Sequence, residues 1–260
     1  VTERKKAEKL LLRYNEELEE EIKNRTDELM EAQRKLEKSK RLSDIGMLAS
    51  TIAHELNNPL NVMRIAVYNI KQEKSLSSLD IHLANIEKKI LQSSMIIKNL
   101  LGYASVRKPY YENVKIVNLV NECIDNCLKK YRDYNVKIIR RFDVDFEYAI
   151  AADALYMLEL IANILENAFQ SFAGKSGRLT VSIKCSAKKD IELIFRDNGT
   201  GIKDKDLNNI FEPFFTRKAG GIGLGLTICK QIVNLHKGRI SIKSKEGSGT
   251  TVSISIPAGF

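Results

Sequence analysis

Apolar residues in the first forty positions recur at alternating spacings of three and four, and charged residues fill most of the positions between them. The seam that they form consists of Leu11, Leu18, Ile22, Leu29, Ala32 and Leu36, with Asn15 and Arg25 at two of its positions. Sustained heptads of this kind predict a coiled coil, in which polar core residues set the register at some cost in stability. A solitary helix exposed on all sides is the alternative interpretation.

Two more helical patterns predict a helical hairpin over residues 42–106. The seam changes phase near Ser39, and a second apolar helix is expected from Leu79 to Val106, with a turn at Ser75–Ser78 before it. Because two helices alone bury little surface, we expect a pair of hairpins to close a four-helix bundle in a homodimer. The seam of the first hairpin helix resumes at Leu42, Ile45, Ala49, Ile52 and Leu56.

Beyond Pro109, helical and strand-like patterns alternate along the chain. This order predicts an α+β fold, with a mixed sheet covered by helices on one face. We therefore divide the chain into a coiled coil (1–41), a helical hairpin (42–108) and a C-terminal α/β sandwich (109–260). Helices are expected at 117–132, 153–172 and 224–237, and strands at 136–142, 178–187, 190–196, 239–244 and 250–256, with a hairpin turn at Lys188-Lys189.

The composition narrows the class of protein. Of 260 residues, 43% are hydrophobic and 29% charged, as in soluble globular proteins, and no stretch approaches 18 uncharged apolar residues. We therefore expect a cytoplasmic segment without membrane contact, although the chain begins at Val1 and an anchor could precede it. The net charge of +9 is scattered among 33 acidic residues, so nucleic acid is not an expected partner. Four cysteines without a CxxC pair are expected to be buried, reduced thiols.

The expected helix at 155–172 carries a polar face besides its apolar one. Glu159, Asn163, Asn167 and Gln170 align on it at three- and four-residue intervals. An ordinary solvent-exposed face is the simpler interpretation of this helix alone. However, two asparagines one turn apart are poor helix formers, and their amide oxygens suit a hard cation such as Mg²⁺.

The segment RDNGTGI at 196–202 places Asp197 at the end of a strand, with Gly199 and Gly201 directly after it. A tight turn accounts for this composition. The functional alternative is an adenine site, in which a buried carboxylate accepts the exocyclic amine and the glycines let the backbone approach the ligand.

The segment FEPFFTRKAGGIGLGLTICKQIV at 211–233 places four glycines before or at the start of an apolar helix. The free N–H groups and the positive end of the helix dipole favour an anion there. No Gly-Lys-Ser/Thr follows, so the segment is not a P-loop. We expect Thr216–Gly221 to form a flexible lid that carries Arg217 and Lys218 toward phosphates.

Taken in this order, five motifs resemble the H, N, G1, F and G2 boxes of sensor histidine kinases of two-component systems. The resemblance covers about residues 42–257, and the opening residues 1–5 are similar to the exit of a PAS sensor domain. It implies a dimerisation and phosphotransfer hairpin, followed by an ATPase domain of the gyrase and heat-shock-chaperone superfamily. The motifs are His54-Glu55-Leu56-Asn57-Asn58-Pro59, Asn163 with Asn167, Asp197-Asn198-Gly199-Thr200-Gly201, Phe211-Glu212-Pro213-Phe214 and Gly221-Ile222-Gly223-Leu224-Gly225-Leu226.

The resemblance implies a site for ATP and Mg²⁺. By motif position, Asn163, Asn167 and Glu159 would lie at the metal, and Asp197 would bind adenine. The other cofactor-binding residues that it implies are Gly199, Gly201, Ile202, Lys218, Gly221, Gly223, Leu224, Gly225, Leu226 and Thr250.

Two features of the chain depart from the family. Gln170 and Ser171 replace the basic and aromatic residues that many members have after the second asparagine. The lid is also short, so either Lys218 or Arg217 could contact the terminal phosphate.

The resemblance assigns phosphorylation to His54. A neutral imidazole nitrogen is a competent nucleophile near neutral pH and would attack the γ-phosphate in line. Glu55 would hold the other ring proton, and Asn58 would orient a water for dephosphorylating the partner regulator. Pro59 would interrupt the helical hydrogen bonding one turn after His54 and help to expose it.

The other two histidines are expected to be structural. His236 precedes Gly238 at a predicted helix end, where a protonated imidazole would complement the helix dipole. His82 has no chemical partner nearby in the sequence and is expected at the surface or an edge.

The predicted function is therefore an ATP-dependent autokinase that passes phosphate from His54 to an aspartate on the receiver domain of a response regulator, and that also acts as its phosphatase. A non-enzymatic dimeric scaffold with a degenerate nucleotide site is one alternative. A chaperone- or topoisomerase-like ATPase is another, and it would use Glu159 to activate water without needing His54.

Overall fold

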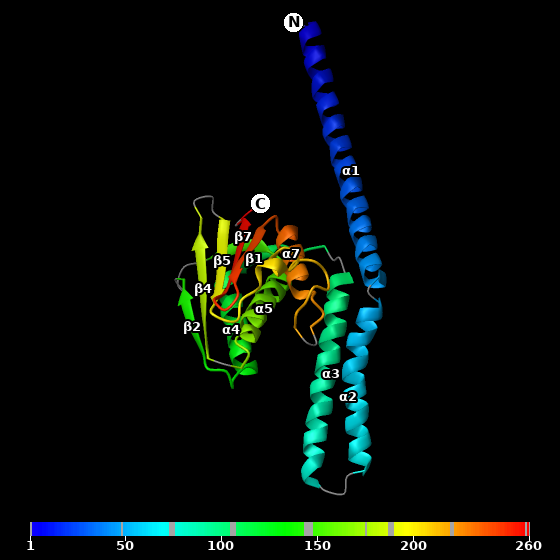
Figure 1. Cartoon of the computed structure of the whole chain (residues 1–260). Coiled ribbons are helices and arrows are strands. Elements are labelled where there is room, and N and C mark those ends of the chain that lie inside the picture. The colour runs from blue at the N-terminus through cyan, green and yellow to red at the C-terminus, as the bar shows by residue number, and fades with distance from the viewer. Residues whose placement is uncertain are drawn as a thin grey trace.

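The computed structural model describes residues 2–47, 49–72, 76–104, 108–142, 148–174, 176–186, 190–218, 221–257 and 259. Three long helices lead into a C-terminal domain, in which helices cover one face of a mixed β-sheet (Figure 1). This arrangement confirms the predicted helical N-terminal region and α/β C-terminal domain. In the described part of the chain, none of the helices is long and apolar enough to cross a membrane.

Helix α1 (Thr2–Met47) extends away from the other elements and continues without interruption past Ser39 (Figure 1). The predicted seam faces solvent in this single chain, since Leu29 and Leu36 are 70% and 71% exposed. Surface ion pairs such as Arg13–Glu17, at 2.9 Å, contribute little to stability. A stripe of exposed leucines on a single helix becomes buried only when it packs against another helix. The coiled coil therefore stays a prediction.

Helices α2 (Ala49–Gln72) and α3 (Leu76–Ala104) lie side by side as an antiparallel hairpin (Figure 1). The predicted turn was wrong over residues 76–78, which form the start of α3, because serines are favoured at helix N-termini as well as in turns. The pairing of two hairpins stays a prediction, although the single hairpin leaves several large apolar side chains exposed. They include Leu60, Ile65, Tyr68, Ile81, Ile90, Ile97 and Leu101.

Helix α2 continues through Pro59, whose ring is buried. The proline removes only the bond that its nitrogen would have donated to the carbonyl of Glu55. Packing of α2 against α3 holds the remaining turns. The lost backbone bond therefore lies directly beside His54.

The C-terminal domain contains two sheets. Its elements are β1 (Glu112–Lys115), α4 (Ile116–Lys130), β2 (Val136–Arg141), β3 (Ala149–Ala152), α5 (Ala154–Ser171), β4 (Gly177–Cys185), β5 (Asp190–Asp197), α6 (Asp204–Leu207), α7 (Gly225–Leu235), β6 (Arg239–Lys245) and β7 (Gly249–Pro257).

The larger sheet has the strand order β2-β4-β5-β7-β6, with β2 and β4 parallel and the other neighbours antiparallel. β4 and β5 pair as the predicted hairpin, and its turn at Lys188-Lys189 lies outside the described residues. β1 and β3 form a separate antiparallel pair that the pattern did not predict. Strands of four residues are too short for a clear alternation of apolar and polar positions.

Helices α4, α5 and α7 cover one face of the larger sheet (Figure 1). Alternate residues of β4, β5 and β7 point into this interface, as a strand period of two requires. Burial raises the pKa of the Cys123 thiol to about 12 and that of Cys127 to about 11. Cys123, Cys127 and Cys229 are buried, but the expectation of burial was wrong for Cys185, which is exposed. The inward-facing strand residues include Leu179, Val181, Ile183, Ile191, Leu193, Phe195, Val252, Ile254 and Ile256.

His236 is structural, but the prediction that it is protonated was wrong. Its side chain is buried, Nε2 accepts a hydrogen bond from the Asp153 nitrogen at 3.0 Å, and Nδ1 lies 2.7 Å from the Ile232 oxygen. An acceptor at Nε2 and a donor at Nδ1 define the neutral tautomer. Burial lowers the pKa of His236, although the bond to Ile232 and the charge of Asp153 oppose this effect. The motif alone could not show that β3 and α5 would bury the ring.

We expect the free energy of unfolding to fall as the pH drops below about 6.5, the ordinary pKa of histidine. The unfolded chain then binds one proton more than the folded chain. The free energy of unfolding therefore changes by at most about 1.4 kcal/mol per pH unit. Urea unfolding of wild type and His236→Gln between pH 5 and pH 8 measures this; the variant should show a flatter profile. His82→Gln is the control and should retain the wild-type slope. Equal slopes in wild type and His236→Gln would contradict the assignment.

Tyr103 joins the N-terminal helices to the C-terminal domain. Its hydroxyl donates to Asp44 at 2.7 Å, and its carbonyl accepts from Arg41 at 3.4 Å, both from α1. The edge of its ring meets Phe214 with centroids 5.9 Å apart. The buried tyrosine thus connects the end of α1 with the segment that precedes the expected lid.

Candidate nucleotide-binding site

A cavity of about 890 Å³ lies between α3, α5, α6 and the glycine-rich segment before α7. Its volume is typical of a site for a small organic ligand. The cavity gathers ten of the residues that the sequence predicted for cofactor binding. They are Asn163, Asn167, Gly201, Ile202, Lys218, Gly221, Gly223, Leu224, Gly225 and Leu226.

Helix α5 forms one wall of this cavity. Asp153 caps its N-terminus by accepting a hydrogen bond from the Tyr156 nitrogen at 3.0 Å. The buried apolar face of α5 then directs Asn163 and Asn167 toward the cavity. Glu159, one turn earlier, does not line it and lies near Gly102 of α3. The wall therefore presents neutral amides rather than that carboxylate.

Lys218 reaches across the cavity to α5. Its ammonium donates to Oδ1 of Asn167 at 2.7 Å and to Oε1 of Gln170 at 2.6 Å. Lys218 is exposed as a whole, but desolvation of its ammonium against α5 lowers its pKa, although the charge of Glu166 opposes this shift. The lid lysine and the asparagine therefore meet where an anionic ligand would lie.

Asp197 is buried at the end of β5, beside the cavity. Its Oδ1 accepts hydrogen bonds from the Gly199 nitrogen at 2.8 Å, the Thr250 nitrogen at 3.2 Å and the Ser171 hydroxyl at 3.2 Å. Burial raises the pKa of Asp197, although the bonds from Gly199, Thr250 and Ser171 oppose it. Three donors on one oxygen fix the carboxylate plane. The adjoining Gly201 leads from it to the cavity wall.

The glycine-rich segment is held by the backbone of the preceding loop. Gly223 has φ of +72°, and a Cβ there would lie 2.5 Å from the carbonyl carbon of Phe214. Its carbonyl accepts a hydrogen bond from the Phe214 nitrogen at 3.0 Å. Only glycine fits this approach without strain. Gly225 then begins α7, so the N–H groups of the first turn border the cavity.

Arg217 and Lys218 occupy different positions. Arg217 donates to the buried Asp206 at 2.8 Å, and this bond lowers the pKa of that carboxyl. Lys218 instead contacts Asn167. This arrangement favours Lys218 over Arg217 as the lid cation nearest the ligand. Two of the expected lid residues, 219 and 220, lie outside the described part of the chain.

The predicted catalytic residues lie apart from the cavity. His54 and Asn58 are exposed on α2, and the neighbouring Glu55 is half-buried. The hairpin helix that lines the cavity is α3, through residues such as Gln92 and Met95. In Figure 1, α3 stands between α2 and the C-terminal domain. His54 would therefore have to approach the ligand by a change of arrangement, or reach a second chain.

A divalent cation would have few direct protein ligands here. Within the described residues, no group of three His, Cys, Asp or Glu side chains could hold a metal. Asn163 and Asn167 supply amide oxygens at the cavity. Magnesium often uses one or two protein oxygens, water and the phosphates of a substrate. The donor set fits Mg²⁺ that arrives with a polyphosphate.

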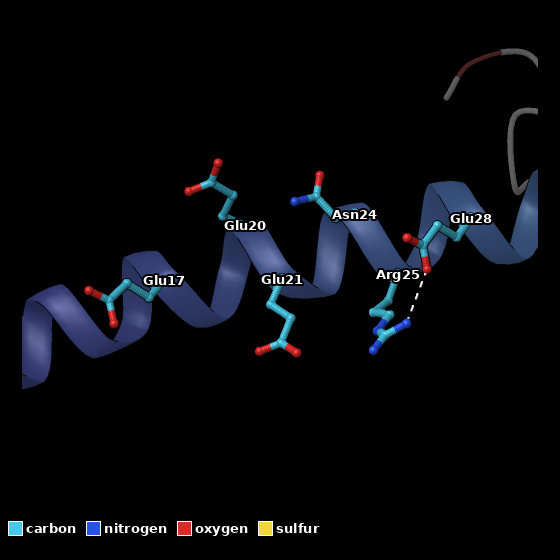
Figure 2. Close-up of a pocket in the computed structure, with 6 residues that line it drawn as sticks. All are labelled: Glu17, Glu20, Glu21, Asn24, Arg25 and Glu28. Carbon is cyan, nitrogen blue, oxygen red and sulfur yellow. Dashed lines mark hydrogen bonds and ion pairs between the residues drawn. The ribbon is translucent and has the colours of Figure 1, made fainter.

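A second depression lies on α1 and carries no site. Figure 2 shows that its side chains point in different directions from one exposed helix. Arg25 pairs with Glu28 at 3.1 Å, and the other acids face solvent. A single helix surface cannot enclose a ligand, so we assign no binding there.

The sequence analysis missed several residues that line the cavity. Lys130, Tyr131 and Glu166 come together at the contact between α4 and α5, and Asp206 lies in α6. None belongs to a glycine-rich or asparagine motif. The available signal was Glu166, an acid that lies between Asn163 and Asn167 and directly precedes the second of them.

Comparison with known proteins identifies the C-terminal part. The model of the family described as histidine kinase-, DNA gyrase B- and HSP90-like ATPase matches residues 152–259. The signal transduction histidine-protein kinase AtoS of Escherichia coli is 30% identical over 87% of this chain and 37% of its own length. Sporulation kinase D of Bacillus subtilis is 29% identical over 88% and 46%. The chain thus spans less than half of these relatives.

Solved structures share the fold. The crystal structure of histidine kinase ThkA in complex with response regulator protein TrrA has a TM-score of 0.74 and 23% identity, covering 89% of this chain and 67% of that one. Full-length ShkA in complex with AMPPNP has a TM-score of 0.60 and 17% identity, covering 82% and 45%. The first likeness extends over both the helical region and the sheet domain.

Proposed function

We propose that this chain, which belongs to the sensor histidine kinases of two-component systems, is an ATP-dependent autokinase that phosphorylates His54. The observation that carries the proposal is the cavity in which Asn163, Asn167, Lys218 and the start of α7 meet beside the phosphotransfer hairpin. The phosphoryl group then passes to an aspartate of a response regulator.

ATP occupies the cavity with its adenine toward Asp197. The buried carboxylate accepts the exocyclic amine, and a donor from the ligand would offset the burial that raises the pKa of Asp197. The phosphates lie at the start of α7, where N–H groups and the helix dipole favour anions. Asn163 and Asn167 would hold Mg²⁺, which when bound would offset negative charge on the phosphate oxygens. Lys218 adds a positive charge from the lid.

Phosphoryl transfer uses His54 as the nucleophile. The lone pair of its neutral ring nitrogen forms a bond to the γ-phosphorus, and the bond from that phosphorus to the bridging oxygen breaks, releasing ADP. The proton on the other ring nitrogen passes to Glu55 or to water. The exposure of His54 on α2 leaves the ring accessible to the ATPase domain of either chain in a dimer.

The same hairpin serves the partner. A receiver domain approaches the exposed histidine, its aspartate takes the phosphoryl group, and Asn58 orients a water when the reaction runs as a phosphatase. The solved complex of a related fold with a response regulator supports a partner of this class. We place this segment in the cytoplasm, because ATP is its phosphate donor.

The domain organisation is part of the proposal. Residues 1–41 form a signalling coiled coil, 42–108 a dimerisation and phosphotransfer domain, and 109–260 the ATPase domain. The exposed leucines of α1 and of the hairpin support a homodimer, because both surfaces would then be buried. A twist or register change of the coiled coil would carry the input, and a one-residue insertion near Ser39 that left activity unchanged would count against this.

The test is incubation of the chain with ATP labelled at the γ-phosphate and Mg²⁺. Label that is labile in acid and stable in base should appear on the protein, as a phosphorus–nitrogen bond requires. If the chain binds AMPPNP but takes up no label from ATP, the result would favour a scaffold and overturn the proposed kinase activity. Release of labelled phosphate without a labelled protein would instead indicate a hydrolase.

A further inference from the structure

Lys130 lines the cavity from an element that no motif predicted. It is the last residue of α4, and its ammonium forms an ion pair with Glu166 of α5. The same ammonium lies 5.6 Å from the ring centroid of Tyr131. All three residues border the cavity, and Glu166 directly precedes Asn167.

The face that α5 presents to the cavity lacks positive charge. The helix contains no Lys or Arg, and its cavity residues are neutral amides together with Glu166. A triphosphate carries several negative charges, so an unpaired carboxylate in the same cavity would repel it. The compensating cation on this wall must therefore come from another element.

Five basic residues line the cavity, and three of them form ion pairs with acidic residues. Arg217 pairs with Asp206, Lys203 pairs with Glu246 at 3.5 Å, and Lys130 pairs with Glu166. Of these three pairs, the one formed by Lys130 adjoins the asparagines of α5. Burial tends to lower the pKa of Lys130, but the bond and charge of Glu166 outweigh this and raise it. Lys130 is therefore charged at neutral pH.

Tyr131 fixes the position of this lysine. Its ring stacks on Phe169 with centroids 5.2 Å apart, and its hydroxyl accepts from Gln170 at 3.5 Å. Gln170 in turn accepts from Lys218 at 2.6 Å. The end of α4 is thus joined through α5 to the lid lysine, and both ammonium groups flank the same stretch of the helix.

We propose that Lys130 is a phosphate-binding residue of the ATP site. Glu166 keeps its ammonium close to the cavity, but also competes with the phosphate for that ammonium. When the triphosphate enters, the ammonium of Lys130 bonds a phosphate oxygen and still shields the ligand from Glu166. This inference rests on the proposed function, because it assumes that the cavity binds ATP.

The test compares binding of AMPPNP, ADP and adenosine to the whole chain by calorimetry. Lys130→Met should lower the affinity for AMPPNP and for ADP by about tenfold or more, the size expected for one lost charge-assisted hydrogen bond. Adenosine affinity should be unchanged, which also shows that the variant is folded. Lys130→Arg should restore most of the affinity. Lys129→Met, an exposed neighbour outside the cavity, is the matched control and should bind like wild type.

Glu166→Gln separates ligand binding from a purely structural ion pair. If Lys130 binds phosphate, removing Glu166 frees it, and AMPPNP should bind a few-fold more tightly than to wild type. If the ion pair only joins α4 to α5, Lys130→Met and Glu166→Gln both break this contact. Both should then weaken the binding of every ligand, adenosine included, and this result overturns the inference. Equal AMPPNP affinity in Lys130→Met and Lys129→Met also overturns it. Failure of wild type to bind AMPPNP would instead overturn the proposed function.

Discussion

The variant His54→Gln is expected to take up no label from ATP, while its affinity for AMPPNP stays at the wild-type value. The glutamine amide has no nucleophilic nitrogen lone pair, so no bond to the γ-phosphorus can form. Nucleotide binding should survive, because His54 is exposed on α2 and does not line the cavity. Labelling followed by acid and base treatment, with calorimetry on the same samples, measures both quantities.

The matched control is His82→Gln, which changes the other histidine of the hairpin and should label like wild type. Label retained on His54→Gln would exclude His54 as the acceptor. Unchanged ATP turnover without label on either protein would point to hydrolysis that does not use the hairpin. Loss of AMPPNP binding in His54→Gln would show that the hairpin and the cavity are more closely connected than the contacts of α3 indicate.

Asp197→Asn is expected to lower AMPPNP affinity at least about 100-fold, because an amide donor then faces the exocyclic amine of adenine in a buried site. The substitution keeps an Oδ1 that can accept from Gly199, Thr250 and Ser171. Autophosphorylation should disappear with the binding. Calorimetry and labelling measure the two effects.

The same variant should unfold at an equal or higher temperature than wild type. Burial raises the pKa of Asp197, so its contribution to folding is most favourable below the unfolded pKa and is lost as the pH rises through the folded one. At neutral pH the ionised carboxylate therefore costs stability, and the neutral amide removes that cost. Asp190→Asn, at the other end of β5, is the control and should bind AMPPNP normally. A lower melting temperature with Asp197→Asn would mean that its hydrogen bonds outweigh its burial.

Much of the fold follows from local pattern. The three- and four-residue spacing of α5 and the alternation of β4, β5 and β7 predicted elements close to those observed. The position of Gly223 likewise follows from its backbone, since a φ of +72° and the close approach of Phe214 select glycine. The pair β1–β3 escaped prediction because four residues give no usable period.

The candidate site divides in the same way. Asn163 and Asn167 were predicted from one helix face and do line the cavity. Glu159 shares that face by spacing but lies near Gly102, because the end of α3 occupies the space beside it. Spacing on a helix gives a direction to a side chain, and neighbouring elements decide what it meets.

The sequence by itself determined the types of elements, the order of the motifs and the residues that we propose for an adenine and phosphate site, because each depends on a few adjacent positions. Only the tertiary structure decided which charges neutralise one another. Lys130 and Glu166 are 36 positions apart in the sequence, and Arg217 pairs with Asp206 across a loop. It also decided that His236 is neutral, since burial and the donor from Asp153 exist only once the chain has folded around the ring.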